Sequence, residues 1–505
     1  MSIIRRYKEN IRKQNTEQSD IYIQYKLAKD LYSNNNFEEA FKLFKKSAVG
    51  GNADAYNCIG IIYYNGTGIQ QSYQRAAKYF KISAKKNNIH AQKNLANLYS
   101  KGIGIIKNEK KAFKWFKKSA NGGNIIAQNK LGELYLSNNK FDIAFYWFEK
   151  SANGGNAKAQ ANLGHMYIDD NSTIQNDEKA FEWFKKSAGG DNADAQKQLG
   201  KMYYFGRGIQ KNKSNAFKCF KRSAEQGNIE SQNMLARMYY TGEGTKKDYT
   251  YAIKWFEVSA NSGNADAQNN LANIYYQGIF IEKNVKKAYE WYEKSANQCN
   301  TDAQNTLGVI YYDGIDVLQN YELAFELFKK SANGGNITAQ NNLGYMYLNG
   351  IGIDKNYTKA IEWYEKSANR GNMHAQDNLG YMYYEVKDYK KALKLFKLSA
   401  EQGNSNAQDI LGDMFYNGYG VKQNYTEAIK WYELSAKGGN INAQISIAYI
   451  YNTILNDNTK ALYWHDYNLN NSQHKKRSLE SIDRITHDQL ETGFPSKVQK
   501  IQKNY

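Results

Sequence analysis

The chain has 505 residues, and Lys and Arg exceed Asp and Glu by 68 to 49, a formal net charge of +19. No run approaches the ~18 apolar residues that a membrane span requires, and residues 1–14 are basic but lack the apolar region of a secretory signal. The three cysteines have no regular spacing, which argues against a disulfide framework. We therefore expect an intracellular, cytoplasmic protein.

A segment close to Asn-x-x-Ala-Gln-x-x-Leu-Gly-x-Met-Tyr recurs along most of the chain. Its first asparagines are Asn52, Asn88, Asn124, Asn156, Asn192, Asn228, Asn264, Asn300, Asn336, Asn372, Asn404 and Asn440. Successive copies lie 36 or 32 residues apart, a period that is typical of stacked helical repeats. Because contacts in such arrays are local, the prediction is one elongated body and not several globular domains.

In chain order, residues 1–20 are a polar lead-in and residues 21–471 contain thirteen predicted helix pairs. Three pairs are short because a Gly-x-Gly loop is deleted between their helices. These are the first pair, the pair that begins at Ile125 and the pair that begins at Met373. The remaining loops follow a helix and recur, so we interpret them as turns and not as phosphate-binding loops.

One unit shows how a helix pair arises. Asn192 is a favourable N-cap, and apolar residues then recur at helical spacing as far as Tyr203, which predicts the first helix, helix A. Gly206 interrupts the pattern. A second apolar stripe begins at Ala216 and predicts helix B, with Gly227 at a left-handed C-cap. Each helix needs its partner and the next repeat to bury its stripe.

The residue after the helix A leucine is always Gly or Ala. The residues at this repeat position are Ala28, Gly60, Ala96, Gly132, Gly164, Gly200, Ala236, Ala272, Gly308, Gly344, Gly380, Gly412 and Ala448. Glycine within a helix costs about 0.5–1 kcal/mol relative to alanine, so we predict that two helix backbones approach each other closely at this position.

All eight tryptophans occupy a single position in helix B. They are Trp115, Trp147, Trp183, Trp255, Trp291, Trp363, Trp431 and Trp464. Confinement to one repeat position indicates packing and not a ligand cage, so these rings are predicted to belong to the core.

After the repeats, residues 472–505 are predicted to hold a capping helix and a basic tail. The capping helix covers Ser478 to Leu490 and protects the open end of the array, and the tail covers Lys497 to Tyr505.

The segment from Ala339 to Gly371 reads A-Q-N-N-L-G-Y-M-Y-L-N-G-I-G-I-D-K-N-Y-T-K-A-I-E-W-Y-E-K-S-A-N-R-G. It resembles the Sel-1-like repeat, a branch of the tetratricopeptide-like solenoids, and the resemblance extends over residues 21–471. It implies an all-α, right-handed α/α superhelical solenoid of about thirteen helix-turn-helix repeats, and an adaptor that assembles other proteins. The paired cysteines of the secreted members that bind β-lactam-like ligands are missing, so that activity is not carried over.

Three positions of helix A share one side of the helix, which we expect to line the concave face of the superhelix. Two residues before the leucine, the first row contains Asn57, Asn129, Asn233, Asn269, Asn305 and Asn341. Two residues after it, the middle row contains Ile61, Asn97, Glu133, His165, Lys201, Arg237, Asn273, Val309, Tyr345, Tyr381 and Asp413. Five residues after it, the third row contains Tyr64, Tyr204, Tyr240, Tyr276, Tyr312, Tyr384 and Tyr416.

These rows suggest a surface that binds a protein or an extended peptide. Amides can bond its backbone, phenols offer area and a hydroxyl, and the varying middle row can select side chains. The basic centre at His165, Lys201 and Arg237, with Lys93 and Lys197 nearby, favours an acidic partner. The alternative is that the tyrosines only fill gaps between repeats and the asparagines are solvated.

A different class of partner, RNA or another polyanion, is the second hypothesis for so basic a chain. Lysine pairs such as Lys185-Lys186 suit it, but they fall on helix B and are partly matched by ion pairs such as Glu182–Lys186. The histidines have no metal-ligand spacing and no catalytic signature appears. We therefore expect no enzyme activity, no metal and no cofactor, and nucleic acid is the less favoured partner.

Overall fold

The computed structural model describes residues 17–169, 174–278, 280–314 and 316–464. In these ranges all regular elements are helices, arranged as successive helix pairs joined by turns, and the predicted all-α repeat fold is confirmed. No helix in the described ranges combines the length and apolar character needed to cross a membrane.

The first helices of the pairs, helix A of each repeat, are α2 (Glu17–Ser33), α4 (Ala53–Asn65), α6 (Ile89–Lys101), α8 (Ile125–Leu136), α10 (Ala157–Ile168), α12 (Ala193–Phe205), α14 (Ile229–Thr241), α16 (Ala265–Gln277), α18 (Thr301–Asp313), α20 (Ile337–Asn349), α22 (Met373–Glu385), α24 (Ser405–Asn417) and α26 (Ile441–Thr453). The second helices are α3 (Phe37–Val49), α5 (Tyr73–Lys85), α7 (Glu109–Asn121), α9 (Phe141–Asn153), α11 (Asp177–Gly189), α13 (Lys213–Glu225), α15 (Tyr249–Asn261), α17 (Val285–Asn297), α19 (Tyr321–Asn333), α21 (Tyr357–Ala368), α23 (Tyr389–Glu401) and α25 (Tyr425–Lys437). Residues 458–464 are also helical and follow α26.

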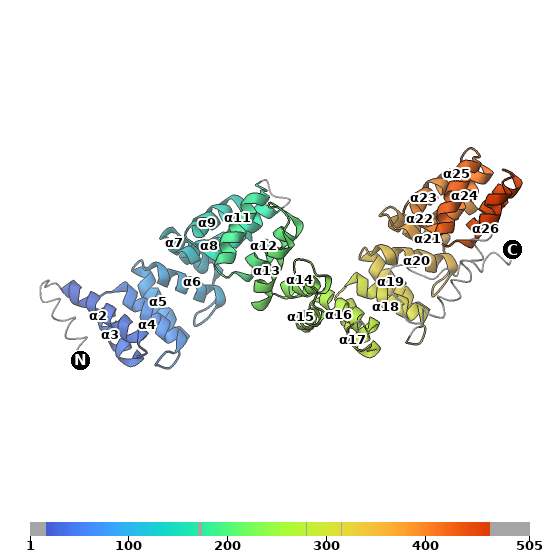
Figure 1. Cartoon of the computed structure of the whole chain (residues 1–505). Helices are drawn as coiled ribbons and strands as arrows, with labels where there is room; N and C mark the ends of the chain where they lie inside the picture. Colours follow the sequence, from blue (N-terminus) through green and yellow to red (C-terminus); the bar gives the residue numbers. More distant parts are fainter. Residues whose placement is uncertain (1–16, 170–173, 279, 315, 465–505) are drawn as a thin grey trace. The chain divides into compact units, whose positions relative to one another are not determined.

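The chain forms two compact units, residues 1–255 and residues 256–505. In the first unit each helix from α2 to α14 packs against the next, and in the second unit the same holds from α16 to α26 (Figure 1). This serial contact is the arrangement expected of stacked repeats. The capping helix predicted at Ser478 to Leu490 and the tail at Lys497 to Tyr505 lie outside the described residues, as does most of the lead-in.

Side-chain caps start both helices in most repeats. The Asn192 side chain accepts a hydrogen bond from the backbone N–H of Ala195, and the other recurring asparagines cap helix A in the same way. Helix B has a matching cap that the sequence analysis missed, for example Asn212, which accepts from the N–H of Asn215. The starts of α3 and α9 have no side-chain cap bond, so helix starts are specified by a local cap in most repeats but not in all.

The Gly-x-Gly loops are turns, as predicted. Gly102 ends α6 in the left-handed conformation with φ 72°, and Gly104 is left-handed with φ 68°. A β-carbon on Gly104 would collide with the backbone carbonyl of Tyr73, the first residue of helix B in the preceding repeat. The loop therefore joins neighbouring repeats, and both conformation and space require glycine there.

The glycine within helix A has a different reason from the one we predicted. At Gly60 an added β-carbon would lie 2.6 Å from the ring of Phe80 on helix B of the same repeat, and Gly412 has this relation to Tyr432. The recurring glycine thus makes room for a fully buried aromatic ring. The prediction of a close approach between two helix backbones is wrong.

The tryptophans are less buried than predicted. Trp147 and Trp464 are buried, while the other six are half-buried against the edge of the core. A lysine one turn later covers the outer ring face in several repeats: the Nζ of Lys366 lies 3.9 Å from the ring centre of Trp363, and Lys186 lies 4.3 Å from that of Trp183. Lys186 therefore contacts a ring, and the predicted ion pair with Glu182 does not form.

Candidate partner-binding face

The first, middle and third rows of helix A together form one surface, which we call the helix A face. Each row sits directly over the core, because the leucine and the following Gly or Ala between the first two rows are buried in every central repeat. The rows differ sharply in what their side chains already contact, and these contacts decide which residues remain available to a partner.

The asparagine row is engaged in contacts between repeats. The Nδ2 of Asn94 donates to the Oδ1 of Asn57 at 3.0 Å, and Asn378 donates in the same way to Asn341 at 3.0 Å. The pairs Asn162–Asn129 and Asn342–Asn305 repeat the arrangement. The row is mostly buried, with Asn57, Asn129, Asn233, Asn269 and Asn341 all below a tenth exposed. Each of these four oxygens already accepts one hydrogen bond from a neighbouring repeat.

The basic centre is neutralised by carboxylates of adjacent repeats. The Nε2 of His165 lies 2.7 Å from the Oδ2 of Asp194, and the Nζ of Lys197 lies 3.0 Å from the Oδ1 of the same carboxylate. The Nζ of Lys197 also lies 3.2 Å from Glu230, whose other oxygen pairs with Lys201. The hydrogen bond from His165 and then the interactions with Lys197 hold the pKa of Asp194 well below its usual range. A preference for acidic segments is therefore weakened at this centre.

Arg237 is the exception among the predicted basic residues. Its side chain is exposed on α14, and it forms no ion pair within the described part of the chain. It can therefore meet a partner without first breaking an internal contact.

The tyrosine row is half-buried and packs edge to face on the start of helix B in its own repeat. Ring centres are 5.3 Å apart for Tyr64 and Tyr73, and 5.2 Å apart for Tyr312 and Tyr321. The pairs Tyr240–Tyr249 and Tyr384–Tyr389 have the same relation, and the ring of Tyr416 is tilted by 56° against that of Tyr425. Tyr204 instead donates its hydroxyl to Glu243, and Tyr276 lies near Tyr292. These rings close the groove between the two helices and present only part of their surface.

Two members of the middle row bind the buried aromatic of helix B. The hydroxyl of Tyr292 donates to the Oδ1 of Asn273 at 2.6 Å, and that of Tyr432 donates to Asp413 at 2.6 Å. Tyr345 is half-buried and Tyr381 is 39% exposed. The row therefore combines structural polar groups with surface-exposed side chains.

The second unit contains shielded carboxyl groups that the sequence analysis did not single out. Burial raises the pKa of Asp377 to about 7, and a hydrogen bond involving Asn404 opposes only part of the effect. Burial and the neighbouring carboxylate of Asp413 raise the pKa of Asp409 to about 7. One oxygen of each is shielded from solvent and has no hydrogen-bond partner in the described ranges. The sequence signal for these groups was an aspartate at the first-row position, where six repeats have asparagine.

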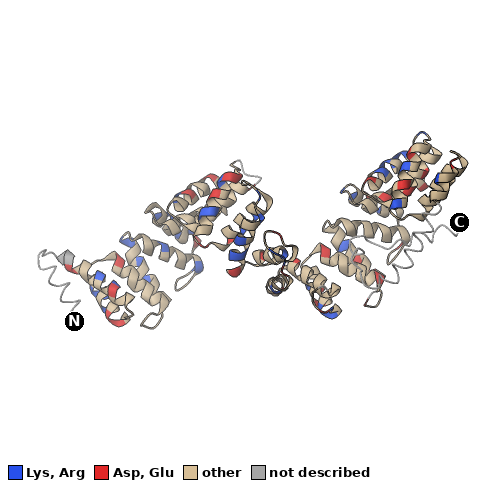
Figure 2. Ribbon diagram, in the orientation of Figure 1, with Lys and Arg blue, Asp and Glu red and all other residues tan. Residues whose placement is uncertain are grey.

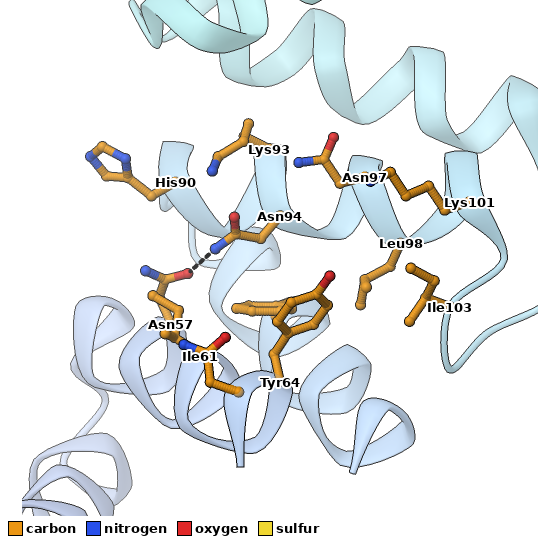
Figure 3. Close-up of a pocket in the computed structure, with 12 residues that line it drawn as sticks. Asn57, Ile61, Tyr64, His90, Lys93, Asn94, Asn97, Leu98, Lys101 and Ile103 are labelled. Atoms are coloured by element: carbon orange, nitrogen blue, oxygen red, sulfur yellow. Dashed lines mark hydrogen bonds between the residues drawn. The ribbon is translucent and has the colours of Figure 1, made fainter. Parts of the chain in front are cut away.

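A pocket of about 420 Å³ opens on the helix A face of the first unit, between α4 and α6 (Figure 3). Its polar lining includes Asn57, Tyr64, Lys93, Asn94, Asn97 and Lys101. Asn57 and Lys93 lie at the first-row position, Asn97 belongs to the middle row, and Tyr64 belongs to the third row. The structure thus brings residues of two successive repeats around one cavity.

Comparison with known proteins agrees with this architecture. The family model described as Sel1 repeat matches twelve segments: residues 24–52, 53–88, 89–124, 125–156, 157–192, 193–228, 229–264, 265–298, 301–336, 337–372, 374–404 and 405–440. Among solved structures, the chain is similar to c5321, a protective antigen present in uropathogenic Escherichia coli strains displaying an SLR fold. The identity is 31% and the TM-score 0.71, with 90% of this chain and 99% of that chain covered.

A Sel1 repeat protein from Oxalobacter formigenes is also similar, with 25% identity, a TM-score of 0.36, and coverage of 68% of this chain and 89% of that chain. No curated protein sequence matches the chain. The helix pairs, the matched repeats and the similarity to c5321 agree, and the chain therefore belongs to the Sel1 repeat family.

Proposed function

We propose that this protein is a non-catalytic scaffold that holds a protein or an extended peptide along the helix A face. Proteins built from Sel1 repeats and related repeats generally act as protein-interaction scaffolds. The observation that carries the proposal here is the contrast within helix A. The leucine position and the position after it keep the same buried packing in successive repeats, whereas the middle row changes chemistry, and its side chains are half-buried except for the exposed Arg237 and Tyr381.

Accessible residues of differing chemistry are what recognition of a particular partner needs. In the first unit Arg237 offers an exposed guanidinium, which suits carboxylates and carbonyls. In the second unit Tyr381 offers a partly exposed ring and a hydroxyl. We place the partner contacts on such residues, with the half-buried tyrosines Tyr204, Tyr240, Tyr276, Tyr312 and Tyr345 as supporting walls.

The net charge of +19 does not by itself favour a polyanion. Lys and Arg are interspersed with Asp and Glu along the described ribbon (Figure 2). Several helix B lysines lie over aromatic rings, and Lys197 and Lys201 are paired with carboxylates. We therefore do not propose binding to RNA.

Affinity capture with the full chain tests the proposal. The intact chain is compared with the double variant Arg237→Ala and Tyr381→Ala, one change in each unit, and captured proteins are quantified by mass spectrometry. We expect the double variant to lose at least one partner by about tenfold or more, because central contacts of this type contribute 2 kcal/mol or more.

A matched control changes a lysine and a tyrosine that are exposed on helix B, Lys114→Ala and Tyr357→Ala. This control should retain the partners of the intact chain. Equal recovery by the intact chain and the helix A variant would contradict the proposed location of binding, and loss confined to the helix B control would place it on the opposite helices.

A further inference from the structure

The pocket between α4 and α6 contains cationic groups without a carboxylate to match them. Its lining includes Lys93 and Lys101, eight residues apart on α6, and no Asp or Glu. Figure 3 shows Lys93, Asn97 and Lys101 spaced along α6 above Tyr64 of α4. Neither lysine forms an ion pair within the described ranges. Burial lowers the pKa of Lys93, because its ammonium group has lost part of its hydration.

The internal repeats supply a direct comparison for Lys93. Lys93 and Lys197 occupy the same repeat position, two residues before the helix A leucine. Lys197 forms ion pairs with two carboxylates. One is Asp194, three residues earlier, and the other is Glu230, which occupies the position of Asp194 in the next repeat. The corresponding residues around Lys93 are His90 and Ile126. The fold therefore has a place for two carboxylates around this lysine, and in this repeat the chain supplies neither.

The rest of the lining suits the side chain of an acidic residue. The bond between Asn94 and Asn57 orients both amides across the pocket, and Asn97 and the hydroxyl of Tyr64 add further polar groups. Ile61, Leu98 and Ile103 form an apolar wall that can cover an aliphatic stem or a neighbouring side chain. The lining contains no arginine and thus no bidentate guanidinium of the kind that recognises phosphate.

We propose that this pocket binds a carboxylate side chain of an acidic peptide segment, with Lys93 as its main cationic partner. The inference rests on the proposed scaffold function and names the chemistry of part of the partner. The bound carboxylate lies beside Lys93 as the carboxylates of Asp194 and Glu230 lie beside Lys197.

The test uses the full chain and a fluorescein-labelled peptide that contains Glu-Leu-Glu between Gly-Ser flanks, with binding followed by fluorescence anisotropy. Ile126→Glu supplies an internal carboxylate at the position of Glu230, and Ile126→Gln is its uncharged control. Because Ile126 is 54% exposed, neither change disturbs the core. We expect binding to fall about tenfold or more in Ile126→Glu and in Lys93→Gln, since a hydrogen bond to a charged group contributes about 1.5–3 kcal/mol.

Ile126→Gln and Lys197→Gln should bind the peptide within about twofold of the intact chain. Circular dichroism checks that every variant is folded. The proposal is overturned if the matching Gln-Leu-Gln peptide binds equally well, if Ile126→Glu binds like the intact chain, or if inorganic phosphate displaces the peptide at the concentration at which unlabelled peptide does. The last outcome would assign the pocket to a small anion. The peptide measurement needs no captured partner, so a negative result would contradict the pocket proposal and not the scaffold function. A negative capture experiment would contradict the scaffold function and not peptide binding in the pocket.

Discussion

The ring of Phe148 occupies the space that a β-carbon on Gly132 would need. An ideal β-carbon at Gly132 would lie 2.6 Å from the Cδ1 and Cε1 atoms of that ring, which is fully buried. Because the ring sits between two helices of one repeat, it cannot retreat without disturbing both. The same relationship recurs at the other glycines of this row, such as Gly164 with Phe184 and Gly344 with Tyr364.

Gly132→Ala should therefore destabilise the protein despite the better helix propensity of alanine. We expect a loss of about 1–3 kcal/mol, as is typical of overpacked cores, measured as a lower urea midpoint at unchanged slope. The control is Gly189→Ala, since Gly189 is also helical but has no atom within 4 Å of an added β-carbon. That control should be neutral or stabilising by about 0.5–1 kcal/mol. Equal effects of both changes would show that the ring does not determine the need for glycine.

The asparagine pairs should couple adjacent repeats. Asn378 of α22 donates to the Oδ1 of Asn341 of α20, and the receiving side chain is 3% exposed. A double-mutant cycle with Asn341→Ala and Asn378→Ala should give a coupling free energy of about 0.5–1.5 kcal/mol, because each single change removes the same bond. Additive losses in urea unfolding would contradict a direct interaction. Asn341 paired with the distant Asn129 is a suitable non-coupled control.

A buried serine links helix B to the first turns of helix A in most repeats. The Oγ of Ser187 donates to the backbone carbonyl of Ala157 at 2.6 Å, and Ser187 is 0% exposed. We expect Ser187→Ala to lower the free energy of unfolding by about 0.5–1.5 kcal/mol. Ser262→Ala removes an exposed serine just after α15 whose hydroxyl donates to the backbone carbonyl of Val258 in that helix, so it should change stability by less than about 0.5 kcal/mol. A neutral Ser187→Ala would rule out a stabilising role for the link.

The shielded aspartates should make the second unit less stable at higher pH. Their pKa is raised from 3.8 to about 7, so the folded chain retains protons that the unfolded chain releases between these values. Stability therefore falls as the pH rises through this interval and stays reduced above it. Asp377→Asn removes the charge and should stabilise the unit by roughly 1–3 kcal/mol at pH 8.

The same substitution should have a much smaller effect at pH 4.5, where the folded carboxyl is already protonated. Urea unfolding at the two pH values measures both effects. The control, Asp142→Asn, changes an exposed carboxylate on α9. If Asp377→Asn raises the free energy of unfolding by the same amount at both pH values, the stabilisation does not arise from the release of a proton.

Much of the fold could be predicted because each helix pair depends on nearby residues. The capping asparagines, the apolar stripes and the left-handed glycines all act within a few positions along the chain, and each is confirmed. The predicted reason for the glycine row was wrong because the ring that requires it lies about one helix further along the chain. Likewise, the tryptophan pattern alone did not show that lysines lie over the outer faces of rings such as Trp183 and Trp363.

By itself, the sequence determined the repeat period, the helix pairs and the side of helix A on which the three rows lie. Only the tertiary structure decided which of those polar residues remain accessible. His165 is hydrogen-bonded to Asp194, 29 residues away in the sequence, and Asn57 accepts a hydrogen bond from Asn94, 37 residues away. Each contact therefore depends on which residue the adjacent repeat has at that position. Lys93 and Lys197 illustrate the consequence, since the same residue at the same repeat position is paired in one place and unmatched in the other.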